Sequence, residues 1–377
     1  MHAVTQLLHD LVAIDSINPD LVPGSAGESA IAEFIAGWLR DAGLDVEIDE
    51  PSPGRPSVIG IARGSGGGRS LMLNAHIDTV GVVGMEQPHT PRIENNQLYG
   101  RGAYDMKGGL AAVMIAAAEA ARHNLRGDVI VTAVADEEYA SLGTESIVKR
   151  WRADAAIVTE PTQLQICLAH KGFIWLEIET RGVAAHGSKP DLGVDAIAKM
   201  GQVLVGLEAL DRSLRSQSSH PLLHSGSLHA SLINGGQELS SYPERCTLMV
   251  ERRTIPGETQ TIVEAQIQEL LAEIGARDAS FQASLRTTFE RLPFEVAADA
   301  PIVVELARQA RSILGAEPQM VGETPWMDSA ILSAAGIPTV VFGPSGTGAH
   351  AVVEWTDLES VDRCAQVLLA TAREFCK

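Results

Sequence analysis

The chain has 377 residues and a formal net charge of −19, and this length favours two structural units. The acidity argues against nucleic acid and against anionic membranes as partners, because phosphate binding needs a basic surface. No apolar run is long enough to span a bilayer. The four cysteines are scattered without a CxxC pair, which favours reduced thiols in a cytoplasmic protein.

The first half of the chain alternates helix-like and strand-like segments. Helices are expected over residues 1–20, 28–43 and 107–124, and strands over residues 56–64, 69–80, 127–136 and 151–162. The glycines of residues 64–68 predict a flexible hairpin turn between the first two strands, since no helix with a Lys-Ser/Thr pair follows to form a phosphate loop. The alternation indicates an α/β domain with a mainly parallel sheet and helices on both faces.

From about Leu168 the pattern changes to half-buried strands accompanied by two long helices. Strands are expected over residues 168–182, 227–236 and 245–257, and helices over residues 193–210 and 258–276. This mixture is typical of a small α+β unit. The α/β pattern returns after about Pro293 and ends in a helix from Leu358. We therefore expect a catalytic domain formed by residues 1–168 and 288–377, interrupted by an inserted domain of residues 169–287.

Several side chains that can bind a metal follow directly after strand-like runs. They are His76 with Asp78, Asp105 in a glycine-rich turn, Glu137 with Glu138, Glu160, and His350. A single His or Asp at a strand end is more often a cap or a satisfied polar group. In open α/β sheets, however, the carboxyl ends of the strands face one crevice, where these side chains could converge. Together they form a His/carboxylate set suited to zinc, cobalt or manganese.

The residue types fit a two-metal hydrolase. Five ligands can serve two ions if one carboxylate bridges them, and Asp105 in its tight turn is the natural bridge. Two ions can hold a hydroxide between them and polarise a substrate carbonyl, while a separate carboxylate moves the proton to the leaving amine. The doublet Glu137-Glu138 can provide both functions, one residue binding metal and the other acting as base. Asp78 could orient the His76 imidazole.

Seven segments, taken in chain order, resemble the M20 family of metallopeptidases and deacylases. They are "HIDTV", "GRGAYDMKGG", "ADEE", "TEPT", "AHGSKP", "ERRTIPGET" and "GAHAVVEW". The resemblance covers nearly the whole chain. It implies that one metal is held by His76, Asp105 and Glu160, and the other by Asp105, Glu138 and His350. It also implies a general acid/base at Glu137, a supporting carboxylate at Asp78 and a cis peptide bond after Asp105.

The resemblance also implies roles for residues 169–287 as a lid or dimerisation domain. His186 matches a histidine that stabilises the oxyanion across a dimer, Arg253 an arginine that binds the substrate carboxylate, and Asn234 a nearby polar contact. His186 could instead cap the following helix, and Asn234 could serve the Asn-Gly-Gly turn. Because successive strand residues face opposite sides, only one of Arg252 and Arg253 should face the cleft.

The expected activity is hydrolysis of the amide bond of an N-acyl amino acid, with two divalent ions, most simply zinc. Acetylornithine deacetylase-like activity is the best single expectation, followed by desuccinylase, dipeptidase and carboxypeptidase activity. A non-catalytic binding protein and a phosphoesterase are the rival classes. The segment "GETPWMDSAIL" departs from the family pattern, so Trp326 and Met327 could reshape the substrate pocket, while Asp328 keeps a structural role.

Overall fold

The computed structural model describes residues 2–377, and the chain forms two compact units. The first comprises the chain up to Leu168, Val296–Val321 and Met327–Lys377, and the second comprises Ala169–Glu295 and Gly322–Trp326. The expected return to the first domain at residue 288 falls inside strand β12 (Gln282–Arg291). That strand pairs with β9 along its length, so the second unit continues beyond it to Glu295.

The main sheet of the first unit has the strand order β1-β2-β6-β3-β7-β15-β8. In that order the strands span Asp45–Asp49, Ser57–Ala62, Val129–Val134, Leu71–His76, Ala155–Val158, Thr339–Val341 and Ile166–His170. The central strands β6, β3, β7 and β15 are parallel, and β1, β2 and β8 add antiparallel pairs at the edges. The short strands β13 (Phe294–Glu295) and β14 (Met320–Glu323) pair with β8. The predicted α/β class with a mainly parallel sheet is confirmed.

The predicted hairpin between the strands expected over residues 56–64 and 69–80, which are β2 and β3, is wrong. Strand β6 lies between β2 and β3, antiparallel to the first and parallel to the second. The glycine-rich connection instead packs against two other backbone segments. A Cβ on Gly64 would come within 2.5 Å of the Arg126 carbonyl oxygen, and one on Gly68 within 2.6 Å of the Cys376 carbonyl oxygen. The glycines therefore permit close backbone packing rather than a tight turn.

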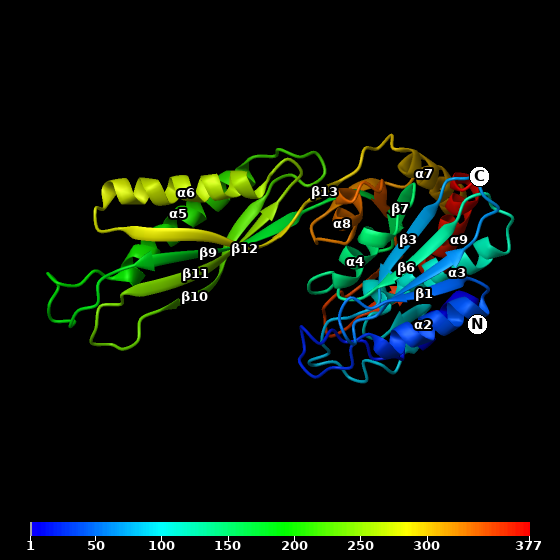
Figure 1. Ribbon diagram of the computed structural model, residues 1–377, viewed down its shortest axis with the longest axis horizontal. Helices are drawn as coiled ribbons and strands as arrows, with labels where there is room; N and C mark the ends of the chain where they lie inside the picture. Colours follow the sequence, from blue (N-terminus) through cyan, green and yellow to red (C-terminus); the bar gives the residue numbers. More distant parts are fainter. Residues whose placement is uncertain (1) are drawn as a thin grey trace. The chain divides into compact units, whose positions relative to one another are not determined.

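Helices cover the sheet of the first unit on both faces (Figure 1). Helices α1 (Ala3–Val12), α3 (Gly108–Ala121), α7 (Pro301–Leu314) and α9 (Leu358–Phe375) pack against one another. Helices α4 (Leu142–Arg150) and α8 (Ser329–Ala334) form a second group, and α2 (Ser29–Asp41) packs on β1 and β2. The alanine-rich helix α3 is buried on almost every side, as expected for a helix enclosed between the sheet and a second helix.

A small second sheet of the first unit was not predicted. Its strands run in the order β16-β17-β5-β4 and span Gly346–Thr347, Trp355–Asp357, Gln97–Tyr99 and Arg92–Glu94. Strand β17 pairs with β5, which joins segments more than 250 residues apart in the sequence. The sheet thereby brings the turn Ala103–Lys107 (η1), which follows β5, next to the loop that contains His350.

The second unit is a four-stranded antiparallel sheet with two helices on one face (Figure 1). The strands, in spatial order, are β10 (Ser227–Gly235), β11 (Arg245–Thr254), β9 (Gly172–Arg181) and β12, and the helices are α5 (Ala196–Ser216) and α6 (Gln260–Arg277). Alternate residues of β9 and β11 are buried in an apolar core shared with both helices. Asp195 and Thr259 cap the two helices through their side chains.

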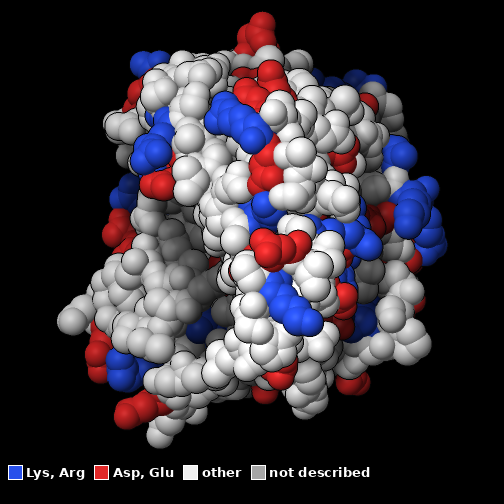
Figure 2. Space-filling model, turned by 90° about the vertical axis from the view of Figure 1, so that its left-hand side faces the viewer, with Lys and Arg blue, Asp and Glu red and all other residues white. Residues whose placement is uncertain are grey.

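Charge is mixed on the surface, and the described helices lack the length and hydropathy of a bilayer span. Figure 2 shows basic and acidic side chains interspersed over the face that it presents. No helix within residues 2–377 is long and apolar enough to cross a membrane.

Candidate metal centre and active site

The predicted metal-binding side chains meet at one edge of the main sheet. His76 ends strand β3, Glu160 lies two residues beyond β7, and the doublet Glu137-Glu138 lies just beyond β6. These three strands are parallel neighbours, so their carboxyl ends share one edge. Asp105 and His350 reach the same place from the turn η1 and from the loop between β16 and β17, which the small sheet joins.

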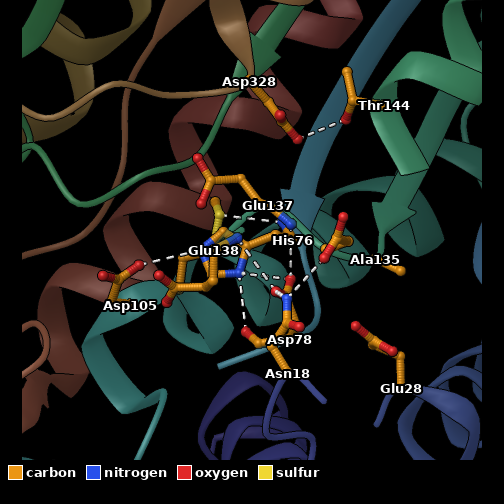
Figure 3. A network of polar contacts seen from close by, with 12 residues as sticks. Asn18, Glu28, His76, Asp78, Asp105, Ala135, Glu137, Glu138, Thr144 and Asp328 are labelled. Atoms are coloured by element: carbon orange, nitrogen blue, oxygen red, sulfur yellow. Dashed lines mark hydrogen bonds and ion pairs between the residues drawn. The ribbon is translucent and has the colours of Figure 1, made fainter. Parts of the chain in front are cut away.

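Asp105 lies between two groups of ligand atoms. One of its oxygens is 3.2 Å from Nε2 of His76, and the other is 3.5 Å from Nε2 of His350. His76 Nε2 is also 3.5 Å from Oε1 of Glu160, and His350 Nε2 is 3.0 Å from Oε2 of Glu138. Figure 3 shows Asp105 and Glu138 on the same side of His76. The structure thus brings together all five side chains that the sequence selected, with Asp105 between the two histidines.

The electrostatics of this cluster suit divalent cations. The carboxylates of Asp105, Glu138 and Glu160 gather around two imidazoles, which leaves an excess of negative charge in a buried place. Two hydrogen bonds from the His350 imidazole raise the pKa of this side chain to about 10. The bond to the Asp105 carboxylate contributes most, and the bond to Glu138 contributes next. Burial, together with the charge of Asp105, raises the pKa of Glu138 to about 7. A set of imidazole nitrogens and carboxylate oxygens with uncompensated negative charge is what zinc and similar ions bind.

Glu137 lies beside the same cluster. One of its carboxylate oxygens is within 4.8 Å of ligand atoms of His76 and Glu160. Burial raises the pKa of the Glu137 carboxyl well above its usual value, and the charge of Glu160 raises it further. A carboxylate with a raised pKa next to a metal site is suited to accept a proton and to return it.

Asp78 supports the glutamate doublet more directly than the sequence suggested. Its carboxylate accepts hydrogen bonds from the backbone N–H groups of Glu137 and Glu138, at 3.1 and 3.2 Å. The His76 imidazole contacts the Asp78 backbone carbonyl at 3.0 Å, whereas the nearer carboxylate oxygen of Asp78 is 3.6 Å from the ring nitrogen. Asp78 therefore fixes the turn that presents both glutamates, and its carbonyl orients the histidine.

Sequence reasoning missed a buried polar network behind this turn. The Asn18 amide donates to Asp78 Oδ2 at 2.8 Å (Figure 3). The same amide donates to Asp136 Oδ1 at 2.9 Å. The Arg55 guanidinium pairs with Asp136 at 2.6 Å and with Glu28 at 2.8 Å. The sequence contained one signal for this network, which is Asp136. It makes the doublet Glu137-Glu138 a run of three acids, and such a run at a strand end needs a cation or several hydrogen-bond donors nearby.

A second missed residue, Glu354, holds the turn that carries Asp105. Its buried carboxylate accepts hydrogen bonds from the backbone N–H groups of Gly102, Tyr104 and Asp105, at 2.9 to 3.0 Å. Arg101 pairs with the same carboxylate at 2.6 Å. The peptide bond between Asp105 and Met106 is cis, as the family resemblance implied. The signal in the sequence was the acid in "VVEW", four residues after His350.

Asp328 is buried in the first unit, where its carboxylate accepts a hydrogen bond from the Thr144 hydroxyl at 2.6 Å (Figure 3). Burial raises the pKa of Asp328 to about 6. The contact connects α8 to α4, which agrees with a structural role for this residue.

The remaining predicted residues lie in the second unit. His186 is exposed, and its ring nitrogen contacts the Ser188 hydroxyl at 2.8 Å. Arg252 is fully buried and pairs with Glu258, whereas the Arg253 side chain is 34% exposed on the opposite face of β11. Asn234 lies on β10, where its backbone carbonyl accepts a hydrogen bond from Thr247. The predicted alternation, by which Arg252 and Arg253 face opposite sides of the strand, is therefore seen in the structure. The choice of Arg253 and the roles of His186, Arg253 and Asn234 stay predictions.

The chain is similar to metallopeptidases and deacylases along nearly its whole length. A family model described as peptidase family M20/M25/M40 matches residues 72–374. The acetylornithine deacetylase of Erwinia tasmaniensis is 28% identical, over 98% of this chain and 97% of its own length. The acetylornithine deacetylase of Myxococcus xanthus is 30% identical, over 99% and 98%. A Bacillus subtilis protein named N-formyl-4-amino-5-aminomethyl-2-methylpyrimidine deformylase is 29% identical, over 94% and 91%.

Solved structures with low sequence identity share the fold. An M20 family metallo-carboxypeptidase from Sulfolobus solfataricus superposes with a TM-score of 0.79 at 18% identity, over 100% of this chain and 99% of the other. A Bacillus subtilis protein described as a dinuclear metal-binding peptidase of the M20 family superposes with a TM-score of 0.78 at 17% identity, over 99% and 97%.

Proposed function

Because the chain belongs to the peptidase family M20/M25/M40, we propose that it hydrolyses the amide bond of an N-acyl amino acid and releases a free amine and a carboxylate. The observation that carries this proposal is the position of Asp105 between His76 and His350, with Glu137 beside the cluster. Two of the relatives compared above are named as deacetylases and one as a deformylase, and such names describe the removal of an acyl group from an amine. Acetylornithine deacetylase-like activity is therefore the first to test.

In this proposal His76, Asp105 and Glu160 hold one divalent ion, and Asp105, Glu138 and His350 hold the other. When bound, such ions polarise a carbonyl and lower the pKa of water. Glu137 accepts the proton of the attacking water and donates it to the leaving amine, a function that its raised pKa favours. Zinc is the first ion to test, with cobalt and manganese as alternatives.

For the second unit we propose that Arg253 binds the substrate carboxylate, that His186 stabilises the oxyanion, and that Asn234 adds a polar contact. These roles follow from the family resemblance together with the exposure of Arg253 and His186. We also propose a homodimer formed through residues 169–287. A reducing, cytoplasmic setting fits the four cysteines, which are buried free thiols.

The test is the release of free amine from N-acetyl amino acids, N-succinyl amino acids and dipeptides, with protein that is metal-free or loaded with zinc or cobalt. Metal-dependent hydrolysis of the N-acyl amino acids supports the proposal. Hydrolysis of dipeptides alone points to a peptidase, and hydrolysis of phosphoesters alone to a phosphoesterase. Tight metal binding with no turnover of any of these compounds would instead support a binding protein.

A further inference from the structure

Aromatic side chains and arginines gather on one face of the sheet in the second unit. The aromatic ones, here called the aromatic platform, are Phe173, Trp175, Phe289 and Trp326, and the arginines are Arg253 and Arg291. Ring centroids of successive platform members lie 5.2 to 6.4 Å apart. The Arg253 guanidinium carbon is 5.1 Å from the centre of the Phe173 ring. The Arg291 guanidinium carbon is 4.6 Å from the centre of the Phe289 ring and 5.4 Å from that of Trp326.

Strand register puts these groups side by side. Phe173 of β9 is paired with Arg253 of β11 on one side and with Arg291 of β12 on the other. Directly paired residues of antiparallel strands point to the same face, so this row places one ring between two guanidinium groups. The next row on the same face pairs Trp175 with Glu251 and with Phe289.

The platform lies outside the apolar core of the second unit. The neighbouring residues Ile174 and Leu176 point to the opposite face, where they pack with helices α5 and α6. Trp175 is 38% exposed, and Phe173, Phe289 and Trp326 are half-buried. Aromatic residues make up only 4% of the chain, so four of them on the face away from the core indicate a surface that binds something flat and apolar.

Arg253 is oriented for a ligand beside this platform. Its Nε donates to Glu251 at 2.6 Å, and the other oxygen of Glu251 accepts from the Trp175 indole at 2.9 Å. Among the described residues, 2–377, this Nε bond is the one hydrogen bond that the Arg253 side chain donates, so its two terminal nitrogens remain available. Two parallel N–H donors next to an aromatic surface match a carboxylate that is attached to an aromatic group.

We propose that the aromatic platform binds the side chain of the substrate and that the preferred substrates are N-acyl amino acids with aromatic side chains. The inference rests on the proposed function and on Arg253 as its carboxylate-binding group. The carboxylate and the side chain of an amino acid are attached to the same carbon, so a carboxylate held at Arg253 leaves the side chain over the rings.

Kinetics with the zinc-loaded protein test the inference. We expect kcat/KM for N-acetylphenylalanine to exceed that for N-acetylalanine by about tenfold or more. Trp175→Ala should lower kcat/KM for N-acetylphenylalanine about tenfold through KM, which is a clearly larger loss than for N-acetylalanine, and Trp175→Phe should largely restore it. The matched control is Val205→Ala, an exposed apolar residue on helix α5 of the same unit, which should change neither substrate. A preference for N-acetylalanine over N-acetylphenylalanine, or an equal loss with both substrates in Trp175→Ala, overturns the inference.

A binding measurement separates this inference from the proposed function. The probes are 3-phenylpropanoate and butanoate, which carry a carboxylate but no amide, and calorimetry gives their affinities for the zinc-loaded protein. Tighter binding of 3-phenylpropanoate by about tenfold, lost in Trp175→Ala, supports the platform even if no N-acyl amino acid is hydrolysed. Equal binding of both probes overturns it whatever the activity. A change of oligomeric state in Trp175→Ala, with unchanged selectivity, also overturns it and assigns the platform to contact with a second copy of the chain.

Discussion

The carboxylate of Asp78 accepts a hydrogen bond from the backbone N–H of Glu137, with 3.1 Å between nitrogen and oxygen. Its second oxygen accepts from the N–H of Glu138 at 3.2 Å. One buried acid therefore fixes the peptide groups of both members of the doublet. Glu138 then lies against His350, while Glu137 lies beside His76 and Glu160. The adjacency of the two glutamates allows one to bind metal while the other carries protons.

The first prediction concerns this division of functions. Glu137→Ala should lose at least about a hundredfold in kcat and keep its metal, because general acid–base groups typically contribute factors of 10² to 10⁴. Glu138→Ala should lose metal affinity, because it removes a carboxylate that lies 3.0 Å from His350. Metal content after dialysis and kcat at saturating zinc measure the two effects separately. Equal metal retention in both variants would show that the assignment is wrong.

The second prediction concerns Asn18, whose amide joins Asp78 to Asp136 behind the doublet. Asn18→Ala should lower kcat about tenfold with little change in KM or metal content, since the turn loses a donor that holds it. Asn18→Asp should be worse, because it adds a third carboxylate between two others.

The matched control for Asn18 is Asn74→Ala. The Asn74 amide is also buried, but it donates to Thr132 within the sheet, at 3.1 Å. This variant should lower the melting temperature without lowering kcat. A parallel loss of kcat in both variants would show that Asn18 acts only through stability.

The ligand positions could be predicted from sequence because each of His76, Glu138 and Glu160 follows a strongly apolar strand. Such strands are recognisable without a structure, and parallel neighbours end at the same edge. Asp105 and His350 were predicted in the same set, but in the structure they lie in a turn and in a loop. Their proximity depends on strands of two or three residues, such as β16 and β5, which are too short to show any periodicity. The supporting role of Glu354 depends on the same long-range pairing and was missed with it.

The buried ion pairs were also beyond sequence reasoning. Arg55 lies 81 residues before Asp136 and in a loop, so nothing local connects them. The wrong hairpin has a related cause. Glycines after a strand indicate either a turn or close backbone packing, and only the position of β6 between β2 and β3 shows that packing applies.

The third prediction is that metal affinity rises with pH and that binding releases protons. In the metal-free protein the pKa of His350 is raised to about 10 and that of Glu138 to about 7. A metal must therefore displace a proton from His350 over the whole range from about pH 6 to about pH 9, and one from Glu138 up to about pH 7. Zinc affinity should therefore increase steadily between about pH 6 and about pH 9. Calorimetry in two buffers of different ionisation enthalpy measures the number of protons released. His350→Ala should reduce that number by about one, and a release unchanged by this substitution would contradict the assignment.

The fourth prediction concerns Lys107, a fully buried lysine whose ammonium donates to the backbone carbonyls of Leu11 and Ile14 at 3.1 and 2.8 Å. Burial lowers the pKa of Lys107 to about 7, against the opposing charge of Glu354. An unfolded chain keeps this proton up to about pH 10.4. Between these values the unfolded state binds more protons than the folded state, so the free energy of unfolding should rise with pH.

Lys107→Met removes the titrating group, and metal-free protein at pH 7, 8 and 9 shows its contribution. Relative to this variant, the parent protein should gain stability with pH, by up to about 1.4 kcal/mol per pH unit, in urea unfolding. The metal ligands titrate in both proteins, so their contribution cancels in the difference. Lys149→Met, at an exposed position on α4, should follow the parent protein at every pH. Parallel curves for the parent and Lys107→Met would mean that the buried amine keeps its proton throughout this range.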